Sequence, residues 1–288
     1  MSAHLTQEAT VDAKNTKPGM SRTQKLLFFL TAWLICLMPF LFWWNTWFGR
    51  KLSDQQLTEY LHDTKKPRHV QQALVQVGER ITRHDATAKQ WYPDLVRLAT
   101  DPVEEVRNTD AWVMGQDTTD IEFHETLLKM LNDPSQMVRG NAALSLVRFG
   151  DATGRPQILA LLQPARIISH DSGRIIDSDR PGPPIHQGGL IAKLQNGHEQ
   201  ILEIRSPIPG RIRSIAGTGA NIVAGAEVAL IDPANEQVWE ALRALYLIGQ
   251  PDDLPAIRPY QRDLPDISND VRQQALETEQ AIRKRSGS

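Results

Sequence analysis

Few side chains in this sequence have the types and spacing that catalysis or metal binding requires. His124 and Glu125 begin like the His-Glu-x-x-His helix of zinc proteases, in which two histidines one turn apart bind the metal. Leu128 occupies the place of the second histidine, so we do not expect zinc there. Cys36 is the only cysteine, which excludes an intramolecular disulfide and every multi-cysteine metal site.

The remaining candidates for chemistry are also incomplete. His170, His186 and His198 lack the spacing of metal ligands, and we expect them to be exposed. Gly217-Thr218-Gly219 lacks the third glycine and the strand–helix setting of a phosphate-binding loop. No Gly-x-Ser-x-Gly sequence marks a nucleophile elbow. The sequence therefore predicts a non-enzymatic protein with no catalytic residues, no metal and no cofactor.

The composition narrows the class of protein. Hydrophobic residues make up 41% of the 288 residues and charged residues 23%, which excludes a disordered chain and a protein with many membrane spans. The 32 basic residues nearly balance the 34 acidic ones, and the net charge is −2. Because the chain is not basic overall, composition gives no argument for nucleic acid as a partner, and we expect none.

An uncharged apolar run, Leu26–Phe48, predicts a transmembrane helix. At about 1.5 Å per residue it spans about 34 Å, enough to cross a hydrocarbon core of about 30 Å. Trp43, Trp44 and Trp47 gather at its end, where tryptophans anchor a helix at the membrane interface. The run is longer than the apolar region of a signal peptide and has no A-x-A cleavage site. We therefore expect a single-pass protein with the lipid bilayer as one partner.

More basic residues precede the run than follow it closely, and this difference modestly favours an N-terminus in the cytoplasm. Those before the run are Lys14, Lys17, Arg22 and Lys25, and those close behind it are Arg50 and Lys51. This orientation predicts a disordered cytoplasmic tail at 1–25, a helix at 26–48, and residues 49–288 in the periplasm of a bacterial inner-membrane protein.

A short motif repeats along the rest of the chain. Asp101-Pro102-Val103-Glu104-Glu105-Val106-Arg107 recurs 32 residues later as Asp133-Pro134-Ser135-Gln136-Met137-Val138-Arg139. Weaker copies begin at Asp232-Pro233 and at Asp266. An aspartate can cap the free N–H groups of a helix, and proline fits its first turn, so each copy predicts a helix start. We expect Asp101, Asp133 and Asp232 to be such caps.

Apolar residues follow these starts with the period of a helix. The predicted buried faces are Val70, Leu74, Val77 and Ile81; Val138, Ala142, Leu146 and Phe149; Val238, Leu242 and Leu245; and Val271, Ala275 and Ile282. Shorter helices are predicted near Pro93, at Phe123–Leu131, near Pro156 and at Leu254–Ile257. Left-handed helix ends are predicted at Gly115, Gly150 and Gly249, and a solvated tail at Arg283-Lys284-Arg285.

The motif, the Ala/Leu-rich helix after it and a closing Gly-Asp resemble HEAT-like repeats of the short type found in phycobilisome lyases. Asp133–Gln163 fits this pattern best. The resemblance implies an α-solenoid of helix pairs over 49–164 and 232–288, and a surface that binds other proteins. Trp91, Trp112 and Trp239 are candidates for partner binding, and burial between repeats is the alternative for each.

Residues 165–231 have a different pattern, in which short Ile- and Val-rich runs alternate with Gly and Pro. The predicted strands are 165–169, 174–177, 190–194, 201–205, 211–215 and 228–231. A small all-β domain inserted into a helical array accounts for this pattern.

Two runs of the insert, Ile204–Ile212 and Ala216–Asp232, resemble the biotinyl/lipoyl carrier domain. This barrel-sandwich hybrid also occurs in the periplasmic adaptor (membrane fusion) proteins of efflux and secretion systems. Carrier domains are acylated on a hairpin lysine. The resemblance places that hairpin at Asn196–Glu199 and Glu199 near the lysine position, while Lys193 lies in a predicted strand. It therefore implies an unmodified docking or spacer domain without biotin or lipoate.

These features predict a mainly α, membrane-anchored scaffold that binds envelope or membrane-complex proteins through its HEAT-like array and its lipoyl-like domain. Two alternatives remain open. The protein could be an adaptor subunit of an efflux or secretion transporter, or an enzyme like the chromophore lyases.

Overall fold

The computed structural model describes residues 21–47 and 50–287, in two compact units, 1–51 and 52–288. The first unit contains helix α1 (Arg22–Trp47), which runs continuously through Pro39. Its stretch Arg22–Phe40 is long and apolar enough to cross a membrane, and none of it is buried. A signal sequence meets the same criteria of length and composition.

Two predictions about the first unit lie outside the described residues. The side chains of Trp43, Trp44 and Trp47 are not among them, nor are residues 1–20 of the expected tail. The interfacial tryptophans and the disordered tail therefore stay predictions.

The helices of the second unit form pairs, as the repeated motif predicts. Before the strands lie α2 (Asp54–Leu61), α3 (Pro67–Thr82), η1 (Ala86–Trp91), α4 (Tyr92–Leu98), α5 (Glu104–Met114), α6 (Ile121–Met130), α7 (Gln136–Arg148) and α8 (Arg155–Leu161). After the strands lie α9 (Asn235–Ile248), η2 (Pro251–Asp253), α10 (Leu254–Ile257), η3 (Arg258–Gln261) and α11 (Asn269–Ser286). Helix α2 is an addition to the sequence prediction. A capping box at Ser53 and Gln56 begins it.

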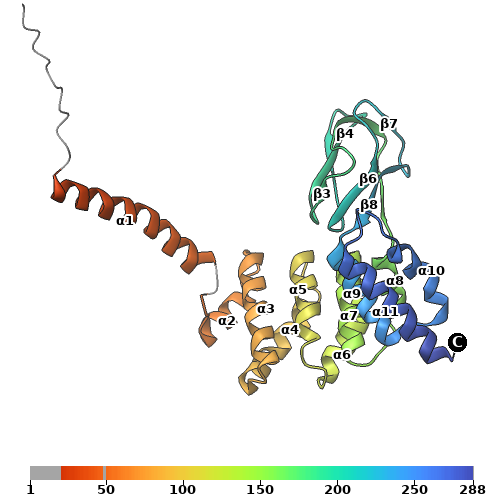
Figure 1. Cartoon of the computed structure of the whole chain (residues 1–288), viewed down its shortest axis with the longest axis horizontal. Helices are drawn as coiled ribbons and strands as arrows, with labels where there is room; N and C mark the ends of the chain where they lie inside the picture. Colours follow the sequence, from red (N-terminus) through yellow and green to blue (C-terminus); the bar gives the residue numbers. More distant parts are fainter. Residues whose placement is uncertain (1–20, 48–49, 288) are drawn as a thin grey trace, which may run out of the picture. The chain divides into compact units, whose positions relative to one another are not determined.

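The longer helices α3, α5, α7, α9 and α11 contact one another in this order, and we call them the long row (Figure 1). The shorter helices α4, α6, α8 and α10 pack against it. One continuous hydrophobic core fills the space between the two sets, from Leu52 to Ile282. The faces predicted from helical period are confirmed, since Val70, Leu74 and Val138 are fully buried in it. Burial of these faces stabilises the stack, because each helix pair is too small to bury its own.

The three predicted left-handed glycines have different outcomes. Gly150 has a φ of +79°, which confirms the prediction at the end of α7. Gly115 and Gly249 have φ values of −66° and −62°, so the prediction is wrong for both. A Cβ at Gly115 would overlap the Ser145 side chain, and close packing of α5 against α7 explains this glycine instead.

The residues predicted as a solvated tail are exposed, but they are helical. Arg283-Lys284-Arg285 forms the last turn of α11. The Arg285 guanidinium donates to the backbone oxygens of Tyr246 and Gly249 at 2.5 and 2.9 Å. It therefore satisfies carbonyl groups that the C-terminus of α9 leaves without a helical partner.

The inserted strands pair into two antiparallel four-stranded sheets. They are β1 (Ala165–Ile168), β2 (Gly173–Ser178), β3 (Pro184–Ile185), β4 (Leu190–Asn196), β5 (Ile201–Arg205), β6 (Gly210–Ile215), β7 (Asn221–Ile222) and β8 (Glu227–Pro233). The strand orders are β1-β8-β6-β3 and β5-β4-β2-β7. Ile212 lies opposite Ile231 in the first sheet, and Leu194 lies opposite Leu202 in the second. These pairs place Ile and Leu side chains in two small cores. In the described chain the strands do not close into a barrel.

The β-domain is attached to the helices at several points. The Gln187 side chain donates to Glu104 Oε1 of α5 at 2.5 Å, and Met137 of α7 packs against one β core. An ion pair of 3.0 Å joins Arg211 to Asp266. The insert therefore contacts the N-terminal turns of α5 and α7 as well as its own chain neighbours.

Candidate protein-interaction surface

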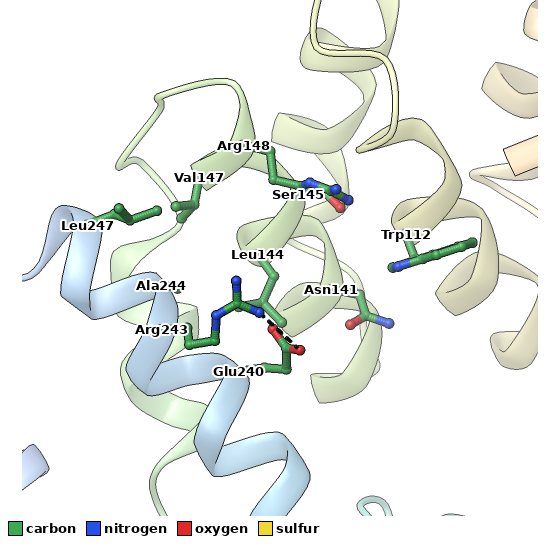
Figure 2. Close-up of a pocket in the computed structure, with 10 residues that line it drawn as sticks. All are labelled: Trp112, Asn141, Leu144, Ser145, Val147, Arg148, Glu240, Arg243, Ala244 and Leu247. Atoms are coloured by element: carbon green, nitrogen blue, oxygen red, sulfur yellow. Dashed lines mark ion pairs between the residues drawn. The ribbon is translucent and has the colours of Figure 1, made fainter. Parts of the chain in front are cut away.

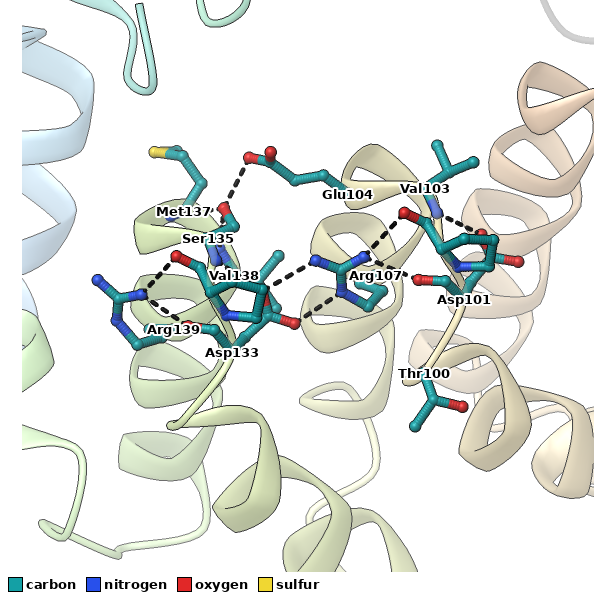
Figure 3. Close-up of polar contacts among 12 residues, drawn as sticks. Thr100, Asp101, Val103, Glu104, Arg107, Asp133, Ser135, Met137, Val138 and Arg139 are labelled. Atoms are coloured by element: carbon teal, nitrogen blue, oxygen red, sulfur yellow. Dashed lines mark hydrogen bonds and ion pairs between the residues drawn. The ribbon is translucent and has the colours of Figure 1, made fainter. Parts of the chain in front are cut away.

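The repeated Asp-Pro motif forms a turn that precedes each helix rather than its first turn (Figure 3). The Asp101 and Asp133 carboxylates each accept the N–H two residues on, from Val103 and Ser135, at 2.8 Å. Those two residues are the N-caps, and the helices begin one residue later. The predicted helix starts are confirmed, but the prediction that the aspartates cap the helices directly is wrong.

Arg107 and Asp133 join two successive repeats, a role the sequence pattern did not reveal. The Arg107 guanidinium donates to both Asp133 oxygens at 2.6 and 3.0 Å, and to the Asp101 carbonyl at 2.8 Å. The hydrogen bond that Arg107 donates to Asp133 raises the pKa of the guanidinium above its usual value. Because both side chains are nearly buried, this bidentate pair holds the helices in register.

We call this series of arginine–aspartate contacts between successive repeats the polar ladder, and it does not continue after Arg139. Arg139 donates to the Asp133 and Pro134 carbonyls at 2.6 and 2.9 Å, as Arg107 does one repeat earlier. The chain then enters β1 where the following aspartate would come. Asp232 instead lies in β8 and pairs with Arg213, so the prediction of a helix cap there is wrong. The inserted domain thus interrupts the polar ladder after α7.

The three candidate tryptophans have different environments. Trp91 is 1% exposed and donates to Thr58 Oγ1 at 3.0 Å, so burial is the correct alternative for it. Trp239 is half-buried, with the Arg243 guanidinium 4.7 Å from its ring centre. Trp112 is 44% exposed. Trp112 is therefore the candidate with the most surface to offer a partner.

Exposed apolar side chains lie on every helix of the long row. Val75, Trp112, Leu144, Leu247 and Leu276 are these residues, and we call the three of them that line one groove, Trp112, Leu144 and Leu247, the apolar stripe. Leu144 is half-buried, and the other four are between 41% and 60% exposed. Trp112 and Leu144 occupy equivalent places in their repeats, 32 residues apart. Exposed apolar side chains that gather at one groove are typical of protein-binding sites.

A groove opens in the middle of the stripe, between α5, α7 and α9 (Figure 2). Its volume is about 410 Å³. The residues that form its walls are Trp112, Asn141, Leu144, Arg148, Arg243 and Leu247. Ser145 lies at its base and donates to the Ala111 carbonyl at 2.8 Å, which fixes α7 against α5. The groove combines apolar walls with two guanidinium groups.

A second hollow of about 520 Å³ lies between α9 and α11. Glu240 lines both hollows, and Trp239 lines the second. The other charged groups of the second hollow are Glu236 and Asp270, in the first turns of α9 and α11. The charge of the surface therefore changes sign along α9.

The β4–β5 hairpin lies where the carrier resemblance places it. Asn196 Oδ1 accepts the N–H groups of His198 and Gln200 at 3.0 Å, which closes the turn. Glu199 is exposed, with a left-handed φ of +60°. Lys193 lies in β4, with its ammonium 4.0 Å from an Asp177 oxygen.

The candidate histidines do not form a site. His124 Nε2 lies 2.8 Å from Asp151 Oδ2, and its ring packs near Phe149. A hydrogen bond from Thr153, followed by other contacts including the one to His124, lowers the pKa of Asp151. His170, His186 and His198 are exposed on separate turns of the insert. Within residues 21–47 and 50–287, no group of three His, Cys, Asp or Glu side chains could hold a metal ion.

Gly217-Thr218-Gly219 forms a turn between β6 and β7. The Gly219 N–H donates to the Ile175 carbonyl, and the Gly217 carbonyl accepts from Ala220. Gly219 has a φ of +92°, which favours glycine. These backbone groups serve the sheet and are not arranged around a phosphate.

Asp110 is a buried carboxyl group that the repeated motif did not reveal. It is 0% exposed, and neither carboxylate oxygen has a hydrogen-bond partner. Burial raises its pKa well above the usual range, and Arg97 opposes this effect. Its place four residues after Val106, on the buried face of α5, was the available signal.

A family model of the HEAT repeat matches residues 125–152. The match covers most of α6 and all of α7. No curated protein matches the chain. Together with the helix pairs and the Asp-Pro turns, this match supports a HEAT-like repeat protein.

Proposed function

We propose that this protein is a non-enzymatic scaffold that binds other proteins through the apolar stripe of its long row. HEAT repeats commonly mediate protein–protein interaction, and their stacked helices provide a long surface. The observation that carries the proposal is the stripe itself, with Trp112 at the wall of its groove. An exposed tryptophan beside a hollow is a typical centre of binding energy, and exposed apolar patches mark interaction sites.

We propose further that α1 anchors the scaffold in a bacterial inner membrane, with 49–288 in the periplasm. The length and apolar composition of α1 support the anchor. The basic residues before it support the orientation. The partners are then proteins of the envelope or of a membrane complex.

The β-domain is proposed as an unmodified lipoyl-like docking or spacer module. Its two four-stranded sheets and its β4–β5 hairpin support the likeness to carrier domains. Glu199 on that hairpin has no amine to acylate. A deletion of 165–231 tests whether the module takes part in export, as an adaptor subunit of a transporter would.

Two aspartate substitutions at exposed apolar positions test the proposed binding surface. Trp112→Asp places a charge on the apolar stripe, and Ile121→Asp places one on α6, where Ile121 is 73% exposed. Both full-length variants are purified from detergent-solubilised membranes beside the wild type. A stoichiometric partner that is lost with Trp112→Asp and kept with Ile121→Asp supports the scaffold. No stoichiometric partner, or one kept by both variants, contradicts it.

A further inference from the structure

We propose that the groove and the second hollow together bind a single segment of a partner protein with charges of opposite sign at its two ends. Acidic residues of the segment lie over Arg148 and Arg243, and an apolar residue lies against Trp112 and Leu144. Basic residues lie over Glu236 and Asp270. This inference rests on the proposed function and specifies the chemistry of the partner.

The basic end of the proposed site is the groove, where two guanidinium groups have few partners. Arg148 is exposed at the groove wall, and its guanidinium makes no hydrogen bond or ion pair within the described residues. Among the same residues Arg243 has one ion pair, with Glu240 at 4.0 Å, and its side chain is 54% exposed. Its guanidinium stacks on Trp239, which holds it in place, and Figure 2 shows Arg243 beside Glu240 in the groove. A partner that covers these groups must supply carboxylates, because a guanidinium that loses water without gaining a partner is costly.

The acidic end of the proposed site is the second hollow, which requires basic residues in the partner. Glu236, Glu240 and Asp270 line the second hollow, and none of its lining residues is basic. All three side chains belong to exposed residues. Lysine or arginine in the partner would pair with them, whereas acidic residues would be repelled.

The two hollows form one site rather than two. Glu240 lines both of them, and the charges along α9 run Glu236, Glu240, Arg243 in one direction. Trp239 and Leu247 provide apolar walls at either end. The two hollows have volumes of about 410 and 520 Å³. One extended segment can place side chains in both, whereas a flat protein surface would leave them empty. The alternation of sign fixes the direction in which such a segment lies.

A selection from a phage library of random dodecapeptides tests the inference. The full-length chain in detergent micelles is the bait, and we expect enrichment of peptides with Asp or Glu at one end, Leu or Trp in the middle and Lys or Arg at the other. With the Arg148→Glu/Arg243→Glu variant as bait, the acidic positions should change to Lys or Arg. Peptides selected on the wild type should bind this variant about tenfold more weakly or worse.

A matched control reverses two exposed charges on elements outside the long row. Lys89→Glu/Arg258→Glu changes η1 and η3, and the selected peptides should be the same as for the wild type. Peptides without an acidic end, or peptides that bind the wild type and Arg148→Glu/Arg243→Glu equally, overturn the inference. A dimer of the full-length chain that this variant dissociates also overturns it, since a second copy is then the occupant.

The two proposals fail in different ways. If a co-purified partner is lost with Trp112→Asp but kept at full strength by Arg148→Glu/Arg243→Glu, the scaffold stands and the charged segment is wrong. If neither variant changes binding, the proposed surface itself is wrong.

Discussion

The junction between α5 and α7 and the junction between α7 and α9 join similar helices in different ways. At the first, Arg107 and Asp133 form a nearly buried bidentate pair, and Gly115 lets α5 approach Ser145 of α7. At the second, the ladder stops at Arg139 and a groove opens. In the sequence, the inserted β-domain lies between α8 and α9, within the second junction. The comparison indicates that a repeat array interrupted by an insert can have an open groove where uninterrupted repeats have a structural contact.

The largest expected loss of stability follows from a substitution at the first junction, between α5 and α7. Arg107→Ala leaves the Asp133 carboxylate nearly buried and without its guanidinium, which should lower the free energy of unfolding by about 3–5 kcal/mol. Arg139→Ala removes only bonds to carbonyl oxygens and should cost about 1 kcal/mol. Urea unfolding followed by circular dichroism measures both. Equal losses would show that the two arginines have the same role.

The next largest effect is expected at Asp110 of α5, which should make the free energy of unfolding depend on pH. Its pKa is raised in the folded state, so the folded protein keeps a proton that the unfolded chain releases near pH 3.9. The free energy of unfolding should therefore fall by about 1.4 kcal/mol per pH unit, from pH 3.9 up to the raised pKa.

The Asp110→Asn variant tests this pH dependence. It should lack this contribution to the slope, while Asp252→Asn, at an exposed aspartate, should keep it. Urea unfolding at a series of pH values measures the difference. Identical pH profiles for the wild type and Asp110→Asn would contradict the prediction.

A smaller effect concerns the attachment of the insert to the first junction. Gln187→Ala removes the hydrogen bond to Glu104 and should lower the free energy of unfolding by about 1 kcal/mol. Hydrogen exchange of residues 184–189 should become faster, while that of α9 stays the same. Unchanged exchange at these residues would show that the hydrogen bond does not hold the insert.

The smallest expected effect is at the second junction. Arg148→Glu/Arg243→Glu changes exposed side chains whose only ion pair is 4.0 Å long, so the free energy of unfolding should change by less than about 0.5 kcal/mol. Thermal unfolding of the variant beside the wild type measures this. A loss as large as that of Arg107→Ala would mean that the groove arginines hold the fold together and do not serve binding.

Local sequence patterns predicted most of the helices and strands of the fold. The period of apolar residues placed the helices that follow Asp101 and Asp133, and alternation with turn residues placed all six longer strands. Such patterns report which side of an element is buried, because burial on one face repeats with the period of that element.

The candidate surface depended on contacts that no local pattern contains. The groove brings together Trp112 of α5, Leu144 of α7 and Leu247 of α9, and no local pattern shows which helices are neighbours. The pairing of Arg107 with Asp133, and of Arg285 with the end of α9, joins residues that are far apart in the chain. Trp91 and Trp112 were equal candidates in the sequence, and only the packing of the helices separated them.

Site-specific photo-crosslinking in intact cells tests the apolar stripe most directly. A benzoylphenylalanine replaces Leu247 on the long row in one strain and Ile121 on α6 in another, and both positions are well exposed. We predict one crosslinked species of defined mass with the probe at position 247 and none with the probe at position 121. A crosslink at position 121 alone, or none at either position, would contradict a scaffold that binds through its long row.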